Sequence, residues 1–450
     1  GSMTQDDVDS VFHYLENVTL NDPTMGIVEM DSTYFGPIPD ELDNDPKVIF
    51  FFSALGSFAG SVFDGYFSHF NQLTELEAQL TGDHSNECEM LYMSCHPVDP
   101  TSYINLSVLT HELQHLIHFG LDENEETWLN EGCSEYAMVL FGMPDPITQF
   151  PSEPNDNLIS WDQHWSDYVQ TMLFTTYLAE QTSGPAFITQ LVANPLNSVA
   201  SIDNTLISLG FSISFTDIFI RWTIANYIND TSVLNGIYGY SALDLPVFNI
   251  ENYATNLPFS HSNNLDNCAA HYFKLSDSFT NNLNIKFTFS QGSEWALNLI
   301  AYEGQTAKEV IPFTGDSISF AQPSSYSLDK LILVVTNTEV ATSDKDYSFE
   351  IDEGNPFEIT SVIADENNFE VYPNPVTQNS TIYLSLKKED NVLVDVFSSD
   401  GKLIKNIISS KLKSGNHSFN LNIPELKQGV YFITLKTDNR IATKRIVVVE

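Results

Sequence analysis

The chain has 450 residues, of which 42% are hydrophobic and 12% aromatic, enough apolar material for two or three folded domains. Sixty acidic residues stand against 18 basic ones, which gives a formal charge of −42 at pH 7. This charge excludes nucleic-acid binding through phosphate neutralisation and opposes binding to an anionic membrane surface. No apolar run approaches the roughly 18 residues that a membrane-spanning helix needs. Gly1-Ser2-Met3 is typical of a cleaved expression tag, so a missing signal peptide carries no information about export.

The charge changes in three steps along the chain. Residues 1–258 contain 36 acidic and two basic residues, residues 259–364 contain 14 and five, and residues 365–450 contain 10 and 11. We therefore expect three domains with these bounds, of which only the last is nearly neutral.

The first segment combines strand and helix patterns. Apolar runs predict buried strands at 48–52 and 89–93, and the Gly- and Phe-rich stretch 56–70 is expected to form a surface excursion. A helix is predicted to start near Thr101 and to end at Gly120. Further helices are predicted at 127–141, at 168–181 and within 186–228. The segment is expected to be an α+β domain that is rich in helix.

Beyond residue 260, short strands replace the helices. The strands predicted for the second segment are 284–289, 295–302, 330–337 and 347–351. Those predicted for the third are 369–372, 381–386, 393–397, 403–408, 418–421, 430–435 and 443–449. Asp400-Gly401 indicates a hairpin turn within the third set. Both segments are expected to be β-sandwich domains.

The four cysteines, Cys88, Cys95, Cys133 and Cys268, form no CxxC pair, which excludes zinc-finger and thioredoxin-like sites. Four cysteines allow three complete pairings, among which the sequence does not choose. A Cys88–Cys95 loop is geometrically easy, and independent free thiols are an equal alternative.

The candidate chemistry lies in His111-Glu112-Leu113-Gln114-His115, an HExxH motif. Positions i and i+4 of a helix share one face, so both imidazoles can reach a single metal ion. Glu112 lies beside them and can accept a proton from a water activated by that metal. A short HExxH also arises by chance, but here it follows an apolar helical pattern and precedes a second acidic helix.

A catalytic zinc site needs three protein ligands and an open position. A metzincin would place its third histidine at position 121, which is Leu121, so that interpretation fails. His118 shares the helix face but lies about 10 Å along the axis from His111 at 1.5 Å per residue, too far for the same ion. We expect His118 to be a buried or capping histidine.

Two glutamates on the next helix are better candidates for the third ligand. Glu131 and Glu135 are spaced i and i+4, so both can face the first helix. One carboxylate can bind the metal while the other holds a histidine ring through its free N–H. The alternative is two solvated acids, against which the neighbouring Trp128, Leu129 and Tyr136 argue.

The combination of HExxH with Trp128-Leu129-Asn130-Glu131-Gly132 resembles the gluzincin metallopeptidases, and residues 45–190 most resemble the hyicolysin-like bacterial secreted peptidases. The resemblance implies a zincin-like fold, with Glu131 as the third zinc ligand. In the thermolysin pattern an aspartate four residues later orients the first histidine. Here that position holds the longer Glu135, and the 15-residue gap between His115 and Glu131 is shorter than in aminopeptidase N.

Tyr168 is a candidate for stabilising the transition state. The segment from Tyr168 to Gly184-Pro185 resembles the aminopeptidase N segment whose leading tyrosine binds the tetrahedral oxyanion. Tyr168 is equally compatible with a core aromatic on an amphipathic helix. His164 is a weaker candidate for the same role, by similarity to thermolysin.

The last segment resembles the sorting domain of the Bacteroidetes type IX secretion system. The matching strings are Phe369-Glu370-Val371-Tyr372-Pro373-Asn374-Pro375, Asp395-Val396-Phe397, Asp400-Gly401-Lys402 and Gly429-Val430-Tyr431-Phe432. A generic immunoglobulin-like module is the alternative. The resemblance implies export across the outer membrane by the type IX machinery, followed by release or anchoring at the cell surface.

These features together predict a secreted zinc endopeptidase that acts on protein or peptide substrates. An aminopeptidase is less favoured, because no Gly-x-Met-Glu-Asn strand lies between residues 80 and 105 to hold a free amine. A surface adhesin or glycan-binding protein with a structural zinc site is the alternative of another class, and a structural site needs no base at Glu112. Calcium among Asp122, Glu123, Glu125 and Glu126 stays open, as do the substrate and the oligomeric state.

Overall fold

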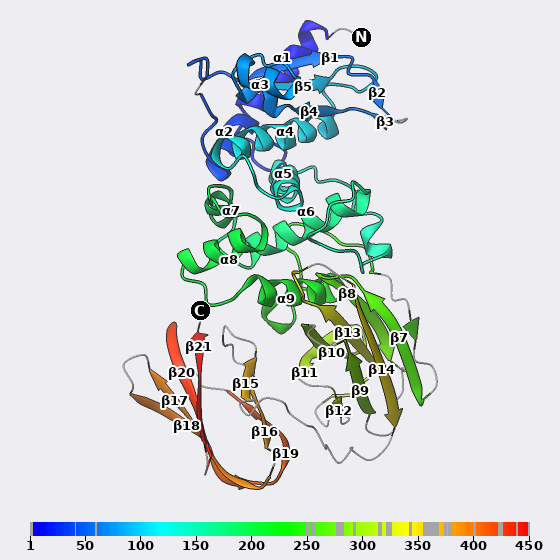
Figure 1. Cartoon of the computed structure of the whole chain (residues 1–450), viewed down its shortest axis with the longest axis vertical. Coiled ribbons are helices and arrows are strands. Elements are labelled where there is room, and N and C mark those ends of the chain that lie inside the picture. Colours follow the sequence, from blue (N-terminus) through cyan, green and yellow to red (C-terminus); the bar gives the residue numbers. More distant parts are fainter. Residues whose placement is uncertain are drawn as a thin grey trace.

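The computed structural model describes residues 3–40, 42–58, 61–248, 252–253, 257–275, 283–290, 294–313, 317–320, 326–341, 344–353, 369–372, 376, 380–386, 388–398, 402–421, 426–437 and 440–448. Helices predominate in the N-terminal half, and mostly antiparallel strands form the C-terminal half (Figure 1). No helix within the described ranges has the length and apolarity needed to cross a bilayer.

The N-terminal part contains a small mixed sheet in the order β1-β5-β4. Strand β1 (Ile49–Ser53) runs parallel to β5 (Met90–Ser94), and the edge strand β4 (Gly65–Phe67) runs antiparallel to β5. The stretch 56–70 is therefore not only a surface excursion, because β4 belongs to the sheet. The strands β2 (Ser57–Phe58) and β3 (Ser61–Val62), which pair antiparallel, precede it. Three helices were not predicted: α1 (Gln5–Glu16), α2 (Ile27–Tyr34) and α3 (Glu75–Thr81).

Six further helices pack in succession below this sheet in Figure 1. They are α4 (Tyr103–Leu121), α5 (Thr127–Phe141), α6 (Trp165–Glu180), α7 (Pro185–Val192), α8 (Ser198–Ser208) and α9 (Phe215–Ile228). Helix α5 packs against α4 on one side and α6 on the other, and its predicted bounds are confirmed. These helices and the small sheet share one apolar core.

Two glycines allow the close approaches that position α4 and α5. Helix α4 starts after Ser102, whose hydroxyl accepts a hydrogen bond from the Asn105 N–H, and it continues past Gly120 to Leu121. Gly120 is therefore not the predicted cap, and a Cβ there would lie 3.0 Å from the Pro39 side chain. In α5, a Cβ on Gly132 would lie 2.5 Å from Thr175 Oγ1 on α6. Glycine at this position lets α5 approach α6 with Thr175 in its present rotamer.

The middle domain is a β-sandwich, as predicted. Its sheets have the orders β11-β10-β13-β8-β6 and β12-β9-β14-β7. The strands are β6 (Asn252–Tyr253), β7 (Phe259–Leu265), β8 (Ala269–Leu275), β9 (Leu283–Phe289), β10 (Trp295–Glu303), β11 (Thr306–Phe313), β12 (Ser317–Phe320), β13 (Lys330–Asn337) and β14 (Lys345–Glu353). The inner faces form a separate core, while the outer face of β13 and β8 packs on α9. Tyr272 on β8 donates a hydrogen bond to the Thr223 carbonyl at 2.6 Å across this contact.

The C-terminal domain is again all-β, with sheets in the orders β15-β16-β19 and β18-β17-β20-β21 around its own core. The strands are β15 (Phe369–Tyr372), β16 (Thr381–Leu386), β17 (Asp390–Ser398), β18 (Leu403–Leu412), β19 (Gly415–Asn420), β20 (Gly429–Thr437) and β21 (Arg440–Val448). Strands β17 and β18 pair antiparallel, and the predicted turn at Asp400-Gly401 between them lies outside the described residues.

Candidate metal centre

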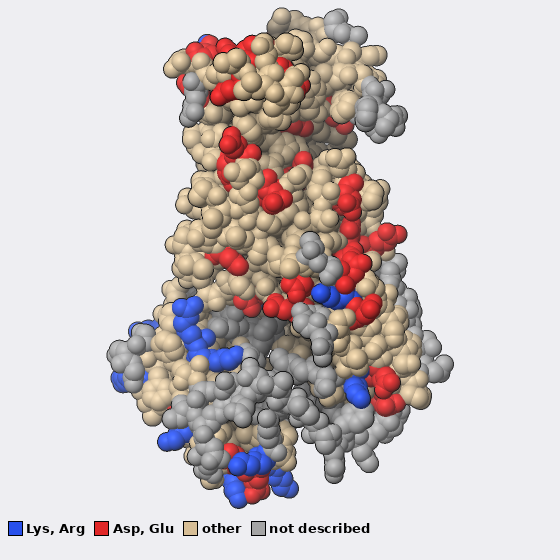
Figure 2. Space-filling view, in the orientation of Figure 1, with Lys and Arg blue, Asp and Glu red and all other residues tan. Residues whose placement is uncertain are grey.

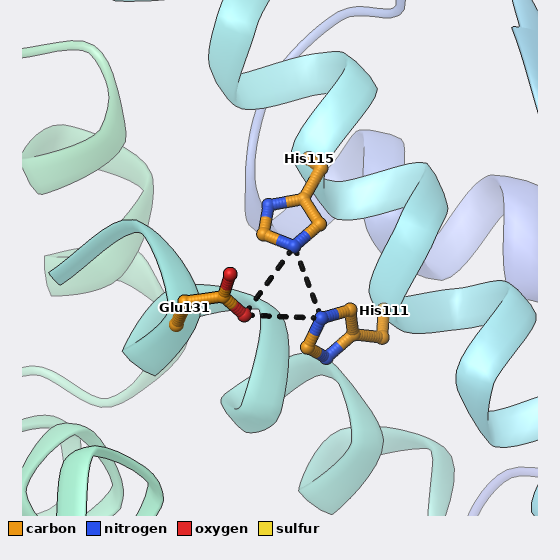
Figure 3. A group of neighbouring side chains, drawn as sticks. All are labelled: His111, His115 and Glu131. Atoms are coloured by element: carbon orange, nitrogen blue, oxygen red, sulfur yellow. Dashed lines mark hydrogen bonds and ion pairs between the residues drawn. The ribbon is translucent and has the colours of Figure 1, made fainter. Parts of the chain in front are cut away.

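His111, His115 and Glu131 bring three ligand atoms together between α4 and α5 (Figure 3). The two histidines lie one turn apart on α4, and Glu131 reaches them from the first turns of α5. The Nε2 atoms of His111 and His115 are 3.0 Å apart. Glu131 Oε2 lies 3.3 Å from the first nitrogen and 3.5 Å from the second. The structure thus brings together the three residues that the sequence predicted as metal ligands.

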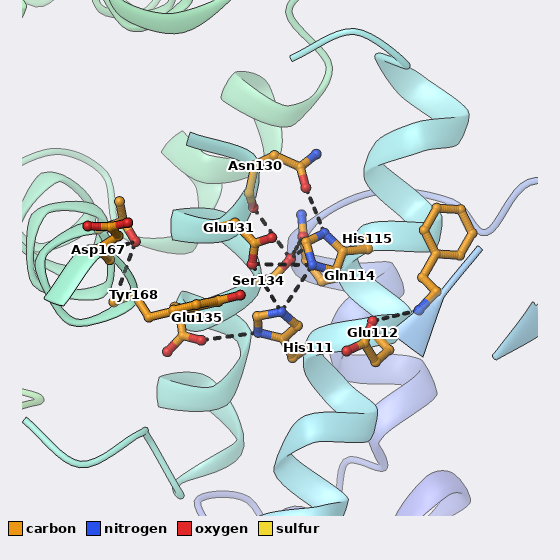
Figure 4. Close-up of polar contacts among 12 residues, drawn as sticks. His111, Glu112, Gln114, His115, Asn130, Glu131, Ser134, Glu135, Asp167 and Tyr168 are labelled. Carbon is orange, nitrogen blue, oxygen red and sulfur yellow. Dashed lines mark hydrogen bonds and ion pairs between the residues drawn. The ribbon is translucent and has the colours of Figure 1, made fainter. Parts of the chain in front are cut away.

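The opposite side of each imidazole meets an acceptor. His115 Nδ1 lies 2.6 Å from Asn130 Oδ1 and 3.0 Å from Ser134 Oγ, and His111 Nδ1 lies 3.2 Å from Glu135 Oε1. An amide oxygen and a carboxylate favour the tautomer that carries its proton on Nδ1. Both Nε2 atoms then present lone pairs to each other and to Glu131 (Figure 4).

The dimensions of this group fit a zinc ion. In a tetrahedral site with ligands about 2.0–2.1 Å from zinc, ligand atoms stand about 3.3 Å apart, which matches the three observed separations. Glu131 Oε2 is buried and has no hydrogen-bond donor among the described residues. Three acceptor atoms that converge on one point need a cation or a proton between them.

The pKa shifts of Glu131 and His111 also favour a positive charge at this group. Burial disfavours the charged form of Glu131, but the neighbouring His115 and His111 outweigh burial and hold the pKa of this carboxyl far below its usual range. Burial also lowers the pKa of His111, and the contacts with Glu131 and Glu135 reverse this effect and raise it well above its ordinary value. The metal-free site therefore retains a proton where a metal ion would otherwise supply positive charge.

Glu135 lies on the same face of α5, one turn beyond Glu131, and is fully buried. Burial raises the pKa of its carboxyl to about 7, although the contact with His111 opposes the shift. Glu135 therefore lies where it can orient His111 and is not part of the three-atom group.

Glu112 is held beside the group by the small sheet. Its Oε2 accepts a hydrogen bond of 2.7 Å from the backbone N–H of Phe67 on the edge strand β4 (Figure 4). Oε1 makes no hydrogen bond within the described part of the chain. One oxygen of this carboxylate is thus fixed, and the other is available as a base.

Tyr168 approaches from α6. Its side chain points toward Glu131 and Glu135 in Figure 4, and its ring packs against Trp161 with centroids 4.7 Å apart. Burial, together with the carboxylates of Glu131, Glu135 and Glu112, raises the pKa of the phenol. The hydroxyl therefore stays protonated and can donate a hydrogen bond. His164 is exposed at the N-cap of α6, with no contact to the group among the described residues.

A pocket of about 240 Å³ opens beside His115. Its lining residues are Phe67, His69, His115, Phe119, Asp122, Glu123 and Asn130. Phe67 belongs to β4, Phe119 to α4 and Asn130 to α5, so all three elements line the pocket. The His115 side of the group is therefore accessible from this pocket.

Sequence reasoning missed two residues that hold His115, namely Asn130 and Ser134. Asn130 was part of the string that indicated Glu131, but nothing local showed that its amide would face a ring nitrogen. Ser134 follows Asn130 by one helical turn. This spacing, close to Glu131 on the same helix, was the available sequence signal that both side chains could reach His115.

The structure also places the cysteines, His118 and the acidic residues considered for calcium. All four cysteines are free, which removes the Cys88–Cys95 pairing from this structure. His118 is buried as expected, and burial, with His115 nearby, lowers the pKa of its imidazole to about 3. Of the four acids considered for calcium, Asp122 and Glu125 come together with His118.

Comparison with known proteins identifies the C-terminal domain. Residues 370–449 match the family model of the secretion system C-terminal sorting domain. The protein is therefore secreted or displayed at the cell surface of a Bacteroidetes bacterium, and this domain implies interaction with the type IX secretion machinery. No curated protein matches the chain.

Solved structures give only distant similarity. PorZ, a surface component of the type IX secretion system of Porphyromonas gingivalis, is 17% identical over 23% of this chain and 14% of that chain, with a TM-score of 0.15. The adhesin domain of Epf from Streptococcus pyogenes is 13% identical over 44% of this chain and 75% of that chain, with a TM-score of 0.14. A GH2 β-galacturonidase from Eisenbergiella tayi is 10% identical over 42% of this chain and 34% of that chain, with a TM-score of 0.13. These scores carry no argument about the helical part or its activity.

Proposed function

We propose that this protein is a secreted zinc-dependent endopeptidase of the gluzincin type, in which Glu112 acts as the general base. The observation that carries the proposal is the convergence of His111 Nε2, His115 Nε2 and Glu131 Oε2 at zinc-ligand separations, with Glu112 beside them. The sorting domain supports an extracellular place of action. The resemblance to hyicolysin-like peptidases supports peptide bonds as the substrate.

In the proposed site, His111, His115 and Glu131 hold the zinc ion, and Glu135 and Asn130 orient the two imidazoles. When bound, zinc supplies Lewis acidity toward a water molecule and the substrate carbonyl. Three protein ligands leave the open coordination position that distinguishes a catalytic site from a structural one.

Glu112 moves the proton. Phe67 fixes Oε2, so Oε1 is the oxygen that accepts the proton from the attacking water and returns it to the amine that leaves. Because the donor to Oε2 is a backbone N–H of a paired strand, the carboxylate is held without relying on a mobile side chain.

Tyr168 stabilises negative charge on the substrate. Its neutral hydroxyl lies on the α6 side of the group, across from β4, and donates a hydrogen bond to the oxyanion of the tetrahedral intermediate. Burial and the surrounding carboxylates raise the pKa of this phenol further above neutral, so it stays in the protonated state that this role requires.

The experiment is a casein digest by the purified full-length chain, with metal content measured on the same sample. We expect stoichiometric zinc, digestion that stops with a chelator, and recovery on adding zinc. Glu112→Gln keeps the shape of the side chain but cannot accept the proton, so it should retain zinc and lose about a hundredfold or more in turnover.

Glu126→Gln is the matched control, because Glu126 is exposed at the start of α5 and lies outside the three-atom group. It should digest casein like the wild type. Near wild-type turnover in Glu112→Gln would contradict the proposal and favour an adhesin with a structural zinc site. Activity confined to substrates with a free amino terminus would instead indicate an aminopeptidase.

A further inference from the structure

We propose a second transition-metal site, separate from the first, formed by His118, Asp122 and Glu125 where α4 ends. One ligand atom from each of these residues lies within 4.8 Å of those from the other two. The group combines one imidazole with two carboxylates, a donor set that can surround a single divalent cation.

The fold of the α4–α5 connection creates this arrangement. His118 and Asp122 are spaced i and i+4, and the Asp122 N–H caps the helix by donating to the His118 carbonyl at 2.7 Å. The short loop that follows brings Glu125 back toward them before α5 starts at Thr127. The three residues therefore belong to one tight turn of chain and not to scattered surface positions.

Each of the three side chains uses one polar atom within the protein and leaves another for a ligand. Glu125 Oε1 accepts hydrogen bonds of 2.6 Å from the backbone N–H groups of Ser198 and Glu126, which leaves Oε2. Asp122 Oδ1 faces the Asn124 N–H at 3.4 Å, which leaves Oδ2. His118 Nδ1 lies 3.5 Å from the Gln114 amide, which leaves Nε2.

Two of these remaining atoms are buried without a partner. His118 is 1% exposed and Asp122 8% exposed, and neither His118 Nε2 nor Asp122 Oδ2 has a hydrogen-bond partner among the described residues. A buried polar atom left unsatisfied is costly, and two carboxylates that close together repel each other. A bound cation removes both penalties.

The donor set selects the class of metal. Calcium and magnesium bind oxygen ligands, whereas imidazole nitrogen favours zinc and other late transition metals. Gln114 Nε2 faces His118 Nδ1, so metal binding through His118 Nε2 requires the Gln114 amide to turn its Oε1 toward Nδ1, where His118 then carries its proton. We therefore assign zinc, and not calcium, to this group.

A metal here would tie together three parts of the helical domain. It would join the end of α4 to the loop before α5, and through the Ser198 N–H bonded to Glu125 it would reach the start of α8. The loop sets the position of α5, which carries Glu131. The inference needs no hydrolytic activity and stands apart from the proposed function.

The test is zinc stoichiometry on the full-length chain. The protein is saturated with zinc, dialysed against a buffer that contains 1 mM calcium and no transition metal, and its metal content is then measured by mass spectrometry. We expect two zinc ions per wild-type chain and one per chain in Asp122→Asn and in Glu125→Gln. The matched control is Glu123→Gln, which removes an exposed acid next to Asp122 and should keep two.

A second measurement isolates the site from the first one. In a His111→Ala/His115→Ala background, zinc should still raise the melting temperature, and Asp122→Asn should abolish that rise while leaving the far-UV circular dichroism unchanged. One zinc per wild-type chain that Asp122→Asn does not remove, loss of the second zinc to calcium, or equal losses in Glu123→Gln and Asp122→Asn would each overturn the proposal. Absence of casein digestion would leave it intact and would count only against the endopeptidase.

Discussion

The Nε2 atoms of His111 and His115 face each other at 3.0 Å, while Asn130 Oδ1 and Glu135 Oε1 lie beside the two Nδ1 atoms and favour ring protons on those opposite sides. Two lone pairs at this distance repel each other unless a positive charge lies between them. Glu131 Oε2 completes the triangle. This relationship separates the group from a chance cluster of polar side chains and underlies the predictions that follow.

Glu131 and Glu135 should differ in their effects on metal binding. Glu131→Ala removes a proposed ligand, and dialysis should then remove the zinc held at His111 and His115. Glu135→Ala removes only the group that orients His111, so zinc should still bind with an affinity lower by about 10–100-fold. Competition with a chromophoric chelator measures both. Full occupancy in Glu131→Ala alongside loss in Glu135→Ala would reverse the assignment of the third ligand.

Tyr168→Phe should lower kcat with little change in KM, because the hydroxyl acts on the transition state and not on substrate binding. Loss of one oxyanion donor typically costs on the order of 10²–10³ in kcat. Tyr103→Phe is the control, since Tyr103 is exposed at the start of α4 on the opposite end from His118. An unchanged kcat in Tyr168→Phe would assign Tyr168 to the core only.

The stability of the metal-free protein should depend on pH through Glu135. Burial raises the pKa of this carboxyl from 4.5 to about 7, so the folded state binds more protons than the unfolded state within that range. Its contribution is therefore most favourable below about pH 4.5 and falls as pH rises toward 7, by an amount on the order of 3 kcal/mol.

Chemical unfolding of the metal-free wild type and of Glu135→Gln between pH 4.5 and 8 measures this effect. The raised pKa of His111 acts in the same direction, because its stabilisation is also lost as pH rises through the folded value. The wild type should lose stability relative to the variant across the window. Parallel curves for the two proteins would show that Glu135 does not titrate there.

Substrate charge should influence the rate of cleavage. The first 258 residues contain 36 acidic and two basic residues, and Figure 2 shows Asp and Glu spread over the helical part while Lys and Arg gather on the β-domains. Such a field concentrates cationic peptides and repels anionic ones. We expect a higher kcat/KM for peptides with Lys or Arg near the scissile bond than for matched acidic peptides.

Ionic strength provides the check on this prediction. The two rates should converge between low salt and about 0.5 M, where the Debye length is below about 5 Å. A preference that persists unchanged at high salt would come from direct contacts in the cleft. A preference for the acidic peptide would contradict steering altogether.

Several features follow from local sequence alone. His111 and His115 share a face because a helix repeats every 3.6 residues, and α5, β13, β15 and β16 occupy the ranges that their apolar patterns predict. The sorting domain is likewise evident from short strings, and the family comparison confirms it. Periodicity is a property of neighbouring residues, so these features need no knowledge of the tertiary fold.

Which of the two glutamates faces both Nε2 atoms could be decided only by the tertiary structure. Glu131 and Glu135 have the same spacing and chemistry, and the packing of α5 between α4 and α6 puts Glu131 on the two Nε2 atoms and Glu135 on His111 Nδ1. The same packing brings the Phe67 N–H from a strand 45 residues away onto Glu112. It also places Gly120 against the Pro39 side chain, within α4 and not at its end. Such pairings depend on how distant helices and strands rotate against one another, and the periodicity of each element contains no information about that rotation.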